Sequence, residues 1–210
     1  MEIIKIYPRG FGANSYILTA DNKTAVVIDP AQPRIESELI RRGLTPKYVL
    51  LTHCHFDHVA GVACLQNAGA KVVCGKQEKS LVGTFADLFE AFGAPRENFV
   101  IDETMEDNQT RVLCDVKITA LHTAGHTAGG VCYLVEEDDK KYLFTGDTLF
   151  AGSIGRTDFP TGDLSALRQS LRRLLSLEDN SLDDIPIYSG HGEDTSLKVE
   201  RQTNPFLLDL

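Results

Sequence analysis

The chain has 210 residues, of which 42% are hydrophobic, and a formal net charge of −9 at neutral pH. This length suits one globular domain, residues 1–210, since no Pro-, Gly- or Ser-rich linker divides it. The negative charge argues against nucleic acid and anionic lipid as partners. No run approaches the ~18 apolar residues of a membrane span, and the start does not have the pattern of a secretory leader.

The distribution of the cysteines indicates the redox state of the compartment in which the protein resides. They are odd in number, scattered, and form no C-x-x-C pair: Cys54, Cys64, Cys74, Cys114 and Cys132. This distribution fits reduced thiols better than a disulfide framework. We therefore expect a cytoplasmic protein in which these residues are small buried apolar side chains.

The first predicted elements are three short β-rich runs divided by turn residues, at 2–8, 14–20 and 24–30. Residues 33–43 predict a helix, because Pro33 stands near its start and Gly43 just past its end. A compact apolar strand at 47–52 follows and stops at His53.

The second half alternates strands and helices. We expect a short helix at 59–69, a strand at 70–75, helical structure within 76–92, a strand region at 112–123, a hairpin at 129–147, a helix at 164–177, a strand at 184–190 and a helix from Thr195. The helix at 164–177 is the most clearly amphipathic, with Asp163 as its N-cap. Hairpins mixed with alternating strands and helices favour an α/β fold of four layers, αββα, in which two mixed sheets are flanked by helices.

The six histidines all follow predicted strands, in turns rich in glycine or threonine: His53, His55, His58, His122, His126 and His191. Strand ends on a rigid scaffold are where active sites tend to be built. Six histidines in such positions are poorly explained as ordinary core or surface residues.

The densest group is Thr-His53-Cys-His55-Phe-Asp57-His58. In an extended segment, alternate residues share a face, so His53, His55 and Asp57 would lie on one side and His58 on the other, unless the extended backbone breaks after His55. This arrangement suits two neighbouring metals, and imidazole with carboxylate suits zinc, iron or manganese. A single structural zinc is the weaker alternative, because such sites are usually closed and rich in cysteine.

Three later motifs place a donor directly after an apolar strand and beside glycine. They are LHTAGHTAGG, FTGDTLF and SGHGED, which contain His126, Asp147 and His191 respectively. Asp147 is a hard oxygen donor that could bridge two cations. Together with residues 53–58, these motifs complete two sets of three ligands plus a bridge.

With these motifs, in this order over residues 53–191, the sequence resembles the metallo-β-lactamase superfamily. The resemblance implies the metallo-β-lactamase fold and two divalent metal ions, zinc before iron or manganese. It implies His53, His55 and His126 as ligands of the first metal. It implies Asp57, His58 and His191 as ligands of the second, with Asp147 as the bridge. His122 matches no ligand position, and we expect it to stabilise a turn.

The segments around Asp147 and His191 also resemble short glyoxalase II-like hydrolases. This resemblance implies hydrolysis of a small-molecule thioester such as S-D-lactoylglutathione, giving D-lactate and glutathione. Larger members add a C-terminal helical domain and have a glutathione-contacting tyrosine where this chain has Glu193. A basic residue is retained as Arg156, our candidate for binding a substrate carboxylate, with a structural ion pair as the alternative.

A dinuclear site indicates a mechanism with a metal-bound hydroxide. Two cations lower the pKa of bound water from about 16 to roughly 7, and Asp57 is expected to orient the hydroxide as it attacks the thioester carbonyl. No serine or cysteine nucleophile is required, so Cys54 is expected to be structural. The alternatives are a persulfide dioxygenase with one iron and a superfamily hydrolase acting on a lactone, lactam or phosphodiester.

Overall fold

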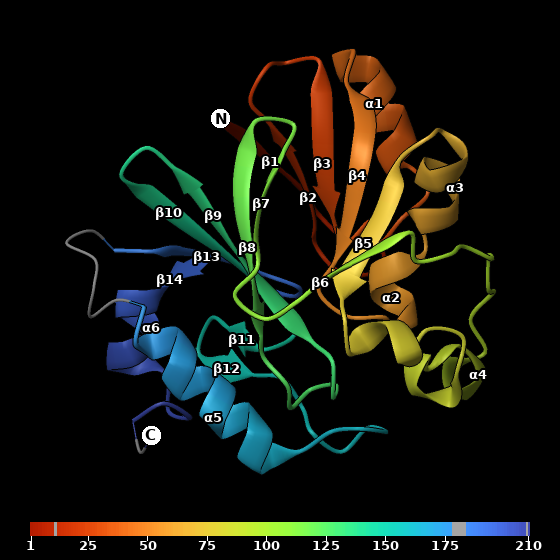
Figure 1. The fold of residues 1–210 in the computed structure, drawn as a ribbon. Coiled ribbons are helices and arrows are strands. Elements are labelled where there is room, and N and C mark those ends of the chain that lie inside the picture. Colours follow the sequence, from red (N-terminus) through yellow and green to blue (C-terminus); the bar gives the residue numbers. More distant parts are fainter. Residues whose placement is uncertain (11, 178–183, 209) are drawn as a thin grey trace.

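The computed structural model describes residues 1–10, 12–177, 184–208 and 210. Two six-stranded sheets form its centre (Figure 1). The first sheet contains, in spatial order, β1 (Glu2–Ile6), β2 (Ser15–Thr19), β3 (Thr24–Ile28), β4 (Thr45–Leu51), β5 (Lys71–Gly75) and β6 (Glu103–Met105). Its first three strands pair antiparallel, whereas β3 to β6 pair parallel.

The second sheet contains, in spatial order, β14 (Thr195–Ser196), β13 (Pro186–Ser189), β10 (Lys140–Gly146), β9 (Val131–Glu137), β8 (Val116–His122) and β7 (Thr110–Leu113). Strands β10 and β13 pair parallel, and the other neighbours pair antiparallel. Both sheets are therefore mixed, as predicted. A small hairpin, β11 (Leu149–Phe150) and β12 (Ser153–Ile154), follows β10.

The two sheets pack face to face through the side chains of alternate residues. In β2, Tyr16 and Leu18 point between the sheets, whereas Ile17 points to the opposite face. The second sheet contributes Tyr133 and Phe144 to the same layer. Because side chains alternate along a strand, each sheet supplies one apolar face to this central layer and another to the helices outside.

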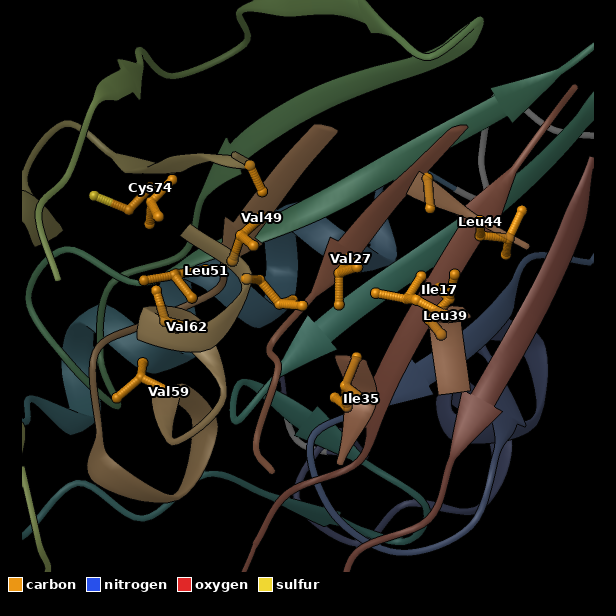
Figure 2. Close-up of a cluster of buried hydrophobic side chains, with 14 of the residues drawn as sticks. Ile17, Val27, Ile35, Leu39, Leu44, Val49, Leu51, Val59, Val62 and Cys74 are labelled. Atoms are coloured by element: carbon orange, nitrogen blue, oxygen red, sulfur yellow. The ribbon is translucent and has the colours of Figure 1, made fainter. Parts of the chain in front are cut away.

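Helices cover both outer faces. On the first sheet, α1 (Ile35–Arg42) and α3 (Val62–Asn67) pack against residues such as Val27 and Val49 (Figure 2). On the second sheet, α5 (Leu164–Leu175) and α6 (Leu197–Thr203) pack in the same way. The predicted αββα sandwich is therefore confirmed. No helix among the described residues combines the length and apolar character needed to cross a bilayer.

Local signals in the sequence identified the helix ends. Gly43 ends α1 in the left-handed conformation, and the Asp163 carboxylate caps α5 by accepting from the backbone N–H of Ala166. Ser196 caps α6 in the same way through Val199.

Two predicted segments differ in the structure. Residues 76–92 contain only the 3₁₀ turns η1 (Glu78–Ser80) and η2 (Phe85–Asp87) and the short helix α4 (Phe89–Phe92). The strand region 112–123 is broken by a tight turn at Cys114 and Asp115, which have φ of 49° and 62°. Neither residue is a glycine or asparagine, so the usual sequence signal for such a turn is missing.

The fold brings strand ends from both sheets to one edge. Strands β3 and β4 of the first sheet and β8, β10 and β13 of the second end near each other (Figure 1). The loops that leave these ends contain the histidine and aspartate motifs. A site at this edge is therefore shared by the two halves of the chain.

Candidate metal centre

The loop after β4 and the turn after β8 form the first ligand group. His53, His55 and His126 are all buried, and each offers a ring nitrogen within 4.8 Å of the others. His55 Nδ1 lies 2.9 Å from His126 Nε2. The structure thus brings together the three residues predicted for the first metal.

The second group comprises Asp57, His58 and His191, again with their ligand atoms within 4.8 Å of one another. The distance from His191 Nε2 to Asp57 Oδ2 is 3.2 Å. Asp57 does not share a face with His53, because the backbone breaks after His55, which is one of the two arrangements that the sequence left open. Extended backbone ends at His55, and the short helix α2 (Phe56–Val59) turns both Asp57 and His58 toward His191.

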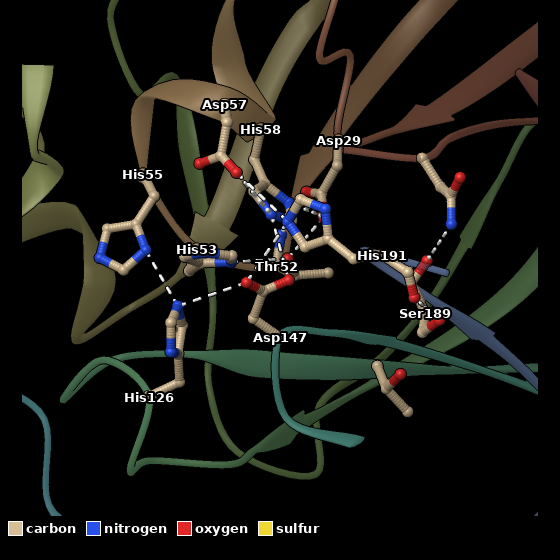
Figure 3. Close-up of polar contacts among 12 residues, drawn as sticks. Asp29, Thr52, His53, His55, Asp57, His58, His126, Asp147, Ser189 and His191 are labelled. Atoms are coloured by element: carbon tan, nitrogen blue, oxygen red, sulfur yellow. Dashed lines mark hydrogen bonds and ion pairs between the residues drawn. The ribbon is translucent and has the colours of Figure 1, made fainter. Parts of the chain in front are cut away.

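Asp147, directly after β10, lies between the two groups (Figure 3). Its Oδ1 is 3.2 Å from His58 Nε2, and its Oδ2 is 3.5 Å from His126 Nε2 and 3.6 Å from His191 Nε2. Oδ2 therefore lies near a histidine of each group, and Oδ1 lies near His58 of the second, so the carboxylate stands between the two groups as a bridging ligand would. A Cβ on Gly190 would lie 2.3 Å from Asp147 Oδ1, so this position has no room for a side chain.

The buried Nε2 atoms of His53 and His55 have no hydrogen-bond partner, and His58 Nε2 and Asp147 Oδ1 have none beyond their 3.2 Å contact with each other. An unpaired buried polar atom costs about 1–3 kcal/mol, so proteins rarely leave several together. Divalent cations would satisfy such nitrogen and oxygen donors, and this donor set suits them. The residues present therefore fit a metal centre.

The surroundings hold four of these donors in their metal-binding forms: His53, His55, Asp57 and Asp147. Burial and the neighbouring imidazoles lower the pKa of His55 to about 3 and that of His53 well below its usual value, so both rings are neutral. Burial alone would raise the pKa of Asp147, but the nearby His58 ring outweighs it and lowers that pKa. The pKa of Asp57 is lowered in the same way. Burial opposes a charge on His58, yet the carboxylates of Asp147 and Asp57 raise its pKa.

Asp29 orients the second group and was missed by the sequence analysis. His58 Nδ1 donates to Asp29 Oδ2 at 2.9 Å, which turns His58 Nε2 toward Asp147. The hydroxyl and the backbone N–H of Thr52 also donate to Asp29. The φ of Asp29 is 47°, an unusual value at a position just past β3. Its signal in the sequence was only an aspartate before proline at a strand end.

Arg156, Cys54 and His122 occupy positions of different kinds. Arg156 donates two hydrogen bonds to Asp158, at 2.6 and 2.5 Å, and also lines the cavity above the cluster. Burial raises the pKa of Cys54, so it is no ready thiolate nucleophile. The ring of His122 bonds to the carbonyl of Ala128 and so stabilises the turn that contains His126, whose Nδ1 donates to Arg156 O.

Comparison with known proteins identifies the class. The sequence profile of the metallo-beta-lactamase superfamily matches residues 8–189. Hydroxyacylglutathione hydrolase GloC from Haemophilus influenzae is 36% identical over 99% of this chain and 97% of its own. The crystal structure of BLEG-1 B3 metallo-beta-lactamase superposes with a TM-score of 0.88 at 29% identity, covering 98% of this chain and 99% of that one. The structure of TTHA1623 in a di-iron-bound form has a TM-score of 0.82 at 33% identity, covering 99% and 100%.

The chain therefore belongs to the metallo-beta-lactamase superfamily. Within it, this protein is a metallo-hydrolase with a histidine and aspartate cluster for divalent metal.

Proposed function

We propose that this protein hydrolyses thioesters of the S-D-lactoylglutathione type at a dinuclear metal centre. The observation that carries this proposal is the position of Asp147, whose carboxylate oxygens lie 3.2–3.6 Å from ring nitrogens of both ligand groups. The choice of a thioester is supported by the 36% identity to hydroxyacylglutathione hydrolase GloC over nearly the whole chain.

Seven residues would hold the metals in the sets described above: His53, His55 and His126; Asp57, His58 and His191; and Asp147 as the bridge. Two divalent cations held there supply Lewis acidity, which makes water a stronger acid and stabilises negative charge on a carbonyl oxygen. We propose zinc as the metal. The di-iron form of TTHA1623 makes iron the first alternative and manganese the second.

The side chains of this chain have separate tasks in the reaction. Asp57 lines the cavity as an ionised carboxylate. It orients the attacking water by accepting a hydrogen bond from it. The water oxygen bonds to the thioester carbon, the C–S bond breaks, and the proton ends on the thiol sulfur. Arg156 lies at the edge of the cavity, where its guanidinium can pair with a carboxylate of the thiol carrier. The thiol carrier is a small cytoplasmic molecule in this proposal.

The test is turnover of S-D-lactoylglutathione by purified protein, with metal counted in the same sample. We expect about two metals per chain and a kcat within the usual enzyme range of about 1–1,000 per second. Asp147→Ala should lose at least one metal and most activity, because both cations lose their shared ligand. Asp139→Ala, an exposed acid at the tip of the β9–β10 hairpin, is the matched control.

A fully metallated protein that leaves the thioester intact would overturn this proposal. Two other substrates then separate the alternatives. Oxygen uptake with glutathione persulfide would indicate a dioxygenase, and cleavage of a lactam or a lactone would indicate another hydrolase of the superfamily. Asp147→Ala protein that retains both metals would instead refute the bridging role.

A further inference from the structure

The cavity above the metal cluster has an apolar wall. Its volume is about 750 Å³, and His55, Asp57, His126, Asp147 and His191 are among the residues that line it. Among the described residues, four phenylalanines also line this cavity: Phe56, Phe92, Phe150 and Phe159. Concave apolar surface beside a few convergent polar groups is typical of a ligand site.

The aromatic rings form a connected surface beside the first ligand group. Phe56 and Phe92 stack with centroids 5.0 Å apart, and Phe92 meets Phe159 edge to face at 6.0 Å. Phe159 in turn lies 5.8 Å from the His55 ring. The Phe92 side chain is 56% exposed, which leaves a large apolar area for a ligand to cover.

The segment that contains Phe92 is held in place from behind. Asp87, which is buried, accepts two hydrogen bonds from Arg96 and one from the backbone N–H of Gly83. The Arg96 guanidinium also lies over the Phe89 ring, 4.4 Å from its centroid. Leu88, another residue of the cavity wall, has a φ of 66°. A residue whose strained backbone conformation is maintained by its surroundings is typical of preorganised sites.

A second cavity indicates which way a thioester would lie. It has a volume of about 490 Å³ and shares Ile154 and Arg156 with the first. Arg168 also lines it, and the described residues contain no ion pair with this side chain. Two guanidinium groups suit the carboxylates of an anionic thiol carrier. The aromatic cavity is then left for the acyl group.

We propose that the aromatic cavity selects thioesters with an apolar, preferably aromatic, acyl group over those with small polar ones. This inference rests on the proposed thioesterase activity and specifies its substrate class. Phe92 is its specificity-determining residue, because it connects Phe56 to Phe159 and leaves most of its own side chain exposed.

The test compares S-D-lactoylglutathione with S-D-mandeloylglutathione on the metal-loaded enzyme. These thioesters share the carrier and the 2-hydroxyacyl group and differ only in methyl against phenyl. We expect kcat/KM to favour mandeloyl by about tenfold or more, the scale of discrimination that apolar pockets reach. Phe92→Ala should remove most of this preference, because the ring that connects Phe56 to Phe159 is lost. Phe85→Ala is the control, since Phe85 is 72% exposed on the preceding turn and does not line the cavity.

Binding of two thioethers gives a readout without catalysis. S-benzylglutathione and S-methylglutathione have no bond for a thioesterase to cleave, and calorimetry should find the benzyl compound bound about tenfold tighter, less so in Phe92→Ala. Equal binding of the two compounds, or a mandeloyl preference that survives Phe92→Ala, would overturn the inference. If neither thioester is hydrolysed but the benzyl preference is present, thioester hydrolysis is refuted and the apolar site stands.

Discussion

At the scale of single residues, Arg156 shows how a weak ion pair can leave a group free for substrate. Its partner Asp158 is 66% exposed, and Arg156 is 56% exposed. Hydrogen bonds from Arg156 lower the pKa of Asp158 to about 2, so the pair is ionised throughout the working range. Exposed pairs contribute little, and a substrate carboxylate would displace Asp158 at low cost.

Variants of this pair test substrate binding by Arg156. Arg156→Ala should raise KM about tenfold for an anionic glutathione thioester, as loss of a hydrogen bond to a charged group predicts. Asp158→Asn should lower the same KM by up to about fivefold, because it removes a competitor. Neither variant should change the KM for a thioester of the same acyl group with N-acetylcysteamine, which is a neutral carrier. Equal shifts with both carriers would make the pair purely structural, and Arg41→Ala on α1 serves as a remote control.

At the scale of elements, α4 and its anchor define a unit whose stability can be measured. A double-mutant cycle of Asp87→Asn and Arg96→Gln tests this anchor. Each single variant should lower the free energy of unfolding by about 1–3 kcal/mol. The double variant should lose less than the sum, because Arg96→Gln alone leaves a buried carboxylate without its charged partner.

Urea unfolding provides these free energies, and the mandeloyl to lactoyl ratio reports on the cavity wall. Arg96→Gln should lower that ratio together with stability, since both depend on the same anchor. Lys76→Gln, in the exposed pair with Glu106, should change stability by less than about 0.5 kcal/mol. Additive losses in the cycle would mean that Asp87 and Arg96 do not act together.

The elements also differ in how far the sequence predicted them. The ligand motifs stand directly after apolar strands, so residue type and position together indicated His53, His126, Asp147 and His191. Segment 76–92 contains good helix formers, yet Gly83 and Leu88 adopt positive φ and divide it into short turns. The roles of Asp29 and Phe92 depend on partners distant in the chain, and spacing alone does not indicate such contacts.

At the scale of the whole molecule, Glu78 connects loops that leave the two different sheets. This side chain is fully buried at the start of η1, after β5, where it accepts hydrogen bonds from the backbone N–H of Cys54 and from the Thr127 hydroxyl. Cys54 follows strand β4 of the first sheet, and Thr127 follows strand β8 of the second. Each loop contains ligands of the first group, so Glu78 joins the two halves of the site.

Burial raises the pKa of Glu78 above its usual value, because desolvation outweighs the donors around it. The folded protein therefore binds this proton more tightly than the unfolded chain does. Its contribution to stability is complete below the ordinary glutamate pKa and is lost as pH rises through the raised one. Burial also raises the pKa of the nearby Cys54 and Cys74 thiols, so they remain neutral over this range.

Comparison with Glu78→Gln isolates this contribution. The unfolding free energy of the metal-free wild type, minus that of the variant, should fall as pH rises above the ordinary glutamate pKa, since only the wild type titrates at this position. Ionisation of the metal ligands is common to both proteins and cancels in the difference. Urea unfolding at several pH values provides the measurement. A difference that rises with pH would mean that the hydrogen bonds from Cys54 and Thr127 outweigh desolvation and hold Glu78 as a buried carboxylate between the two sheets.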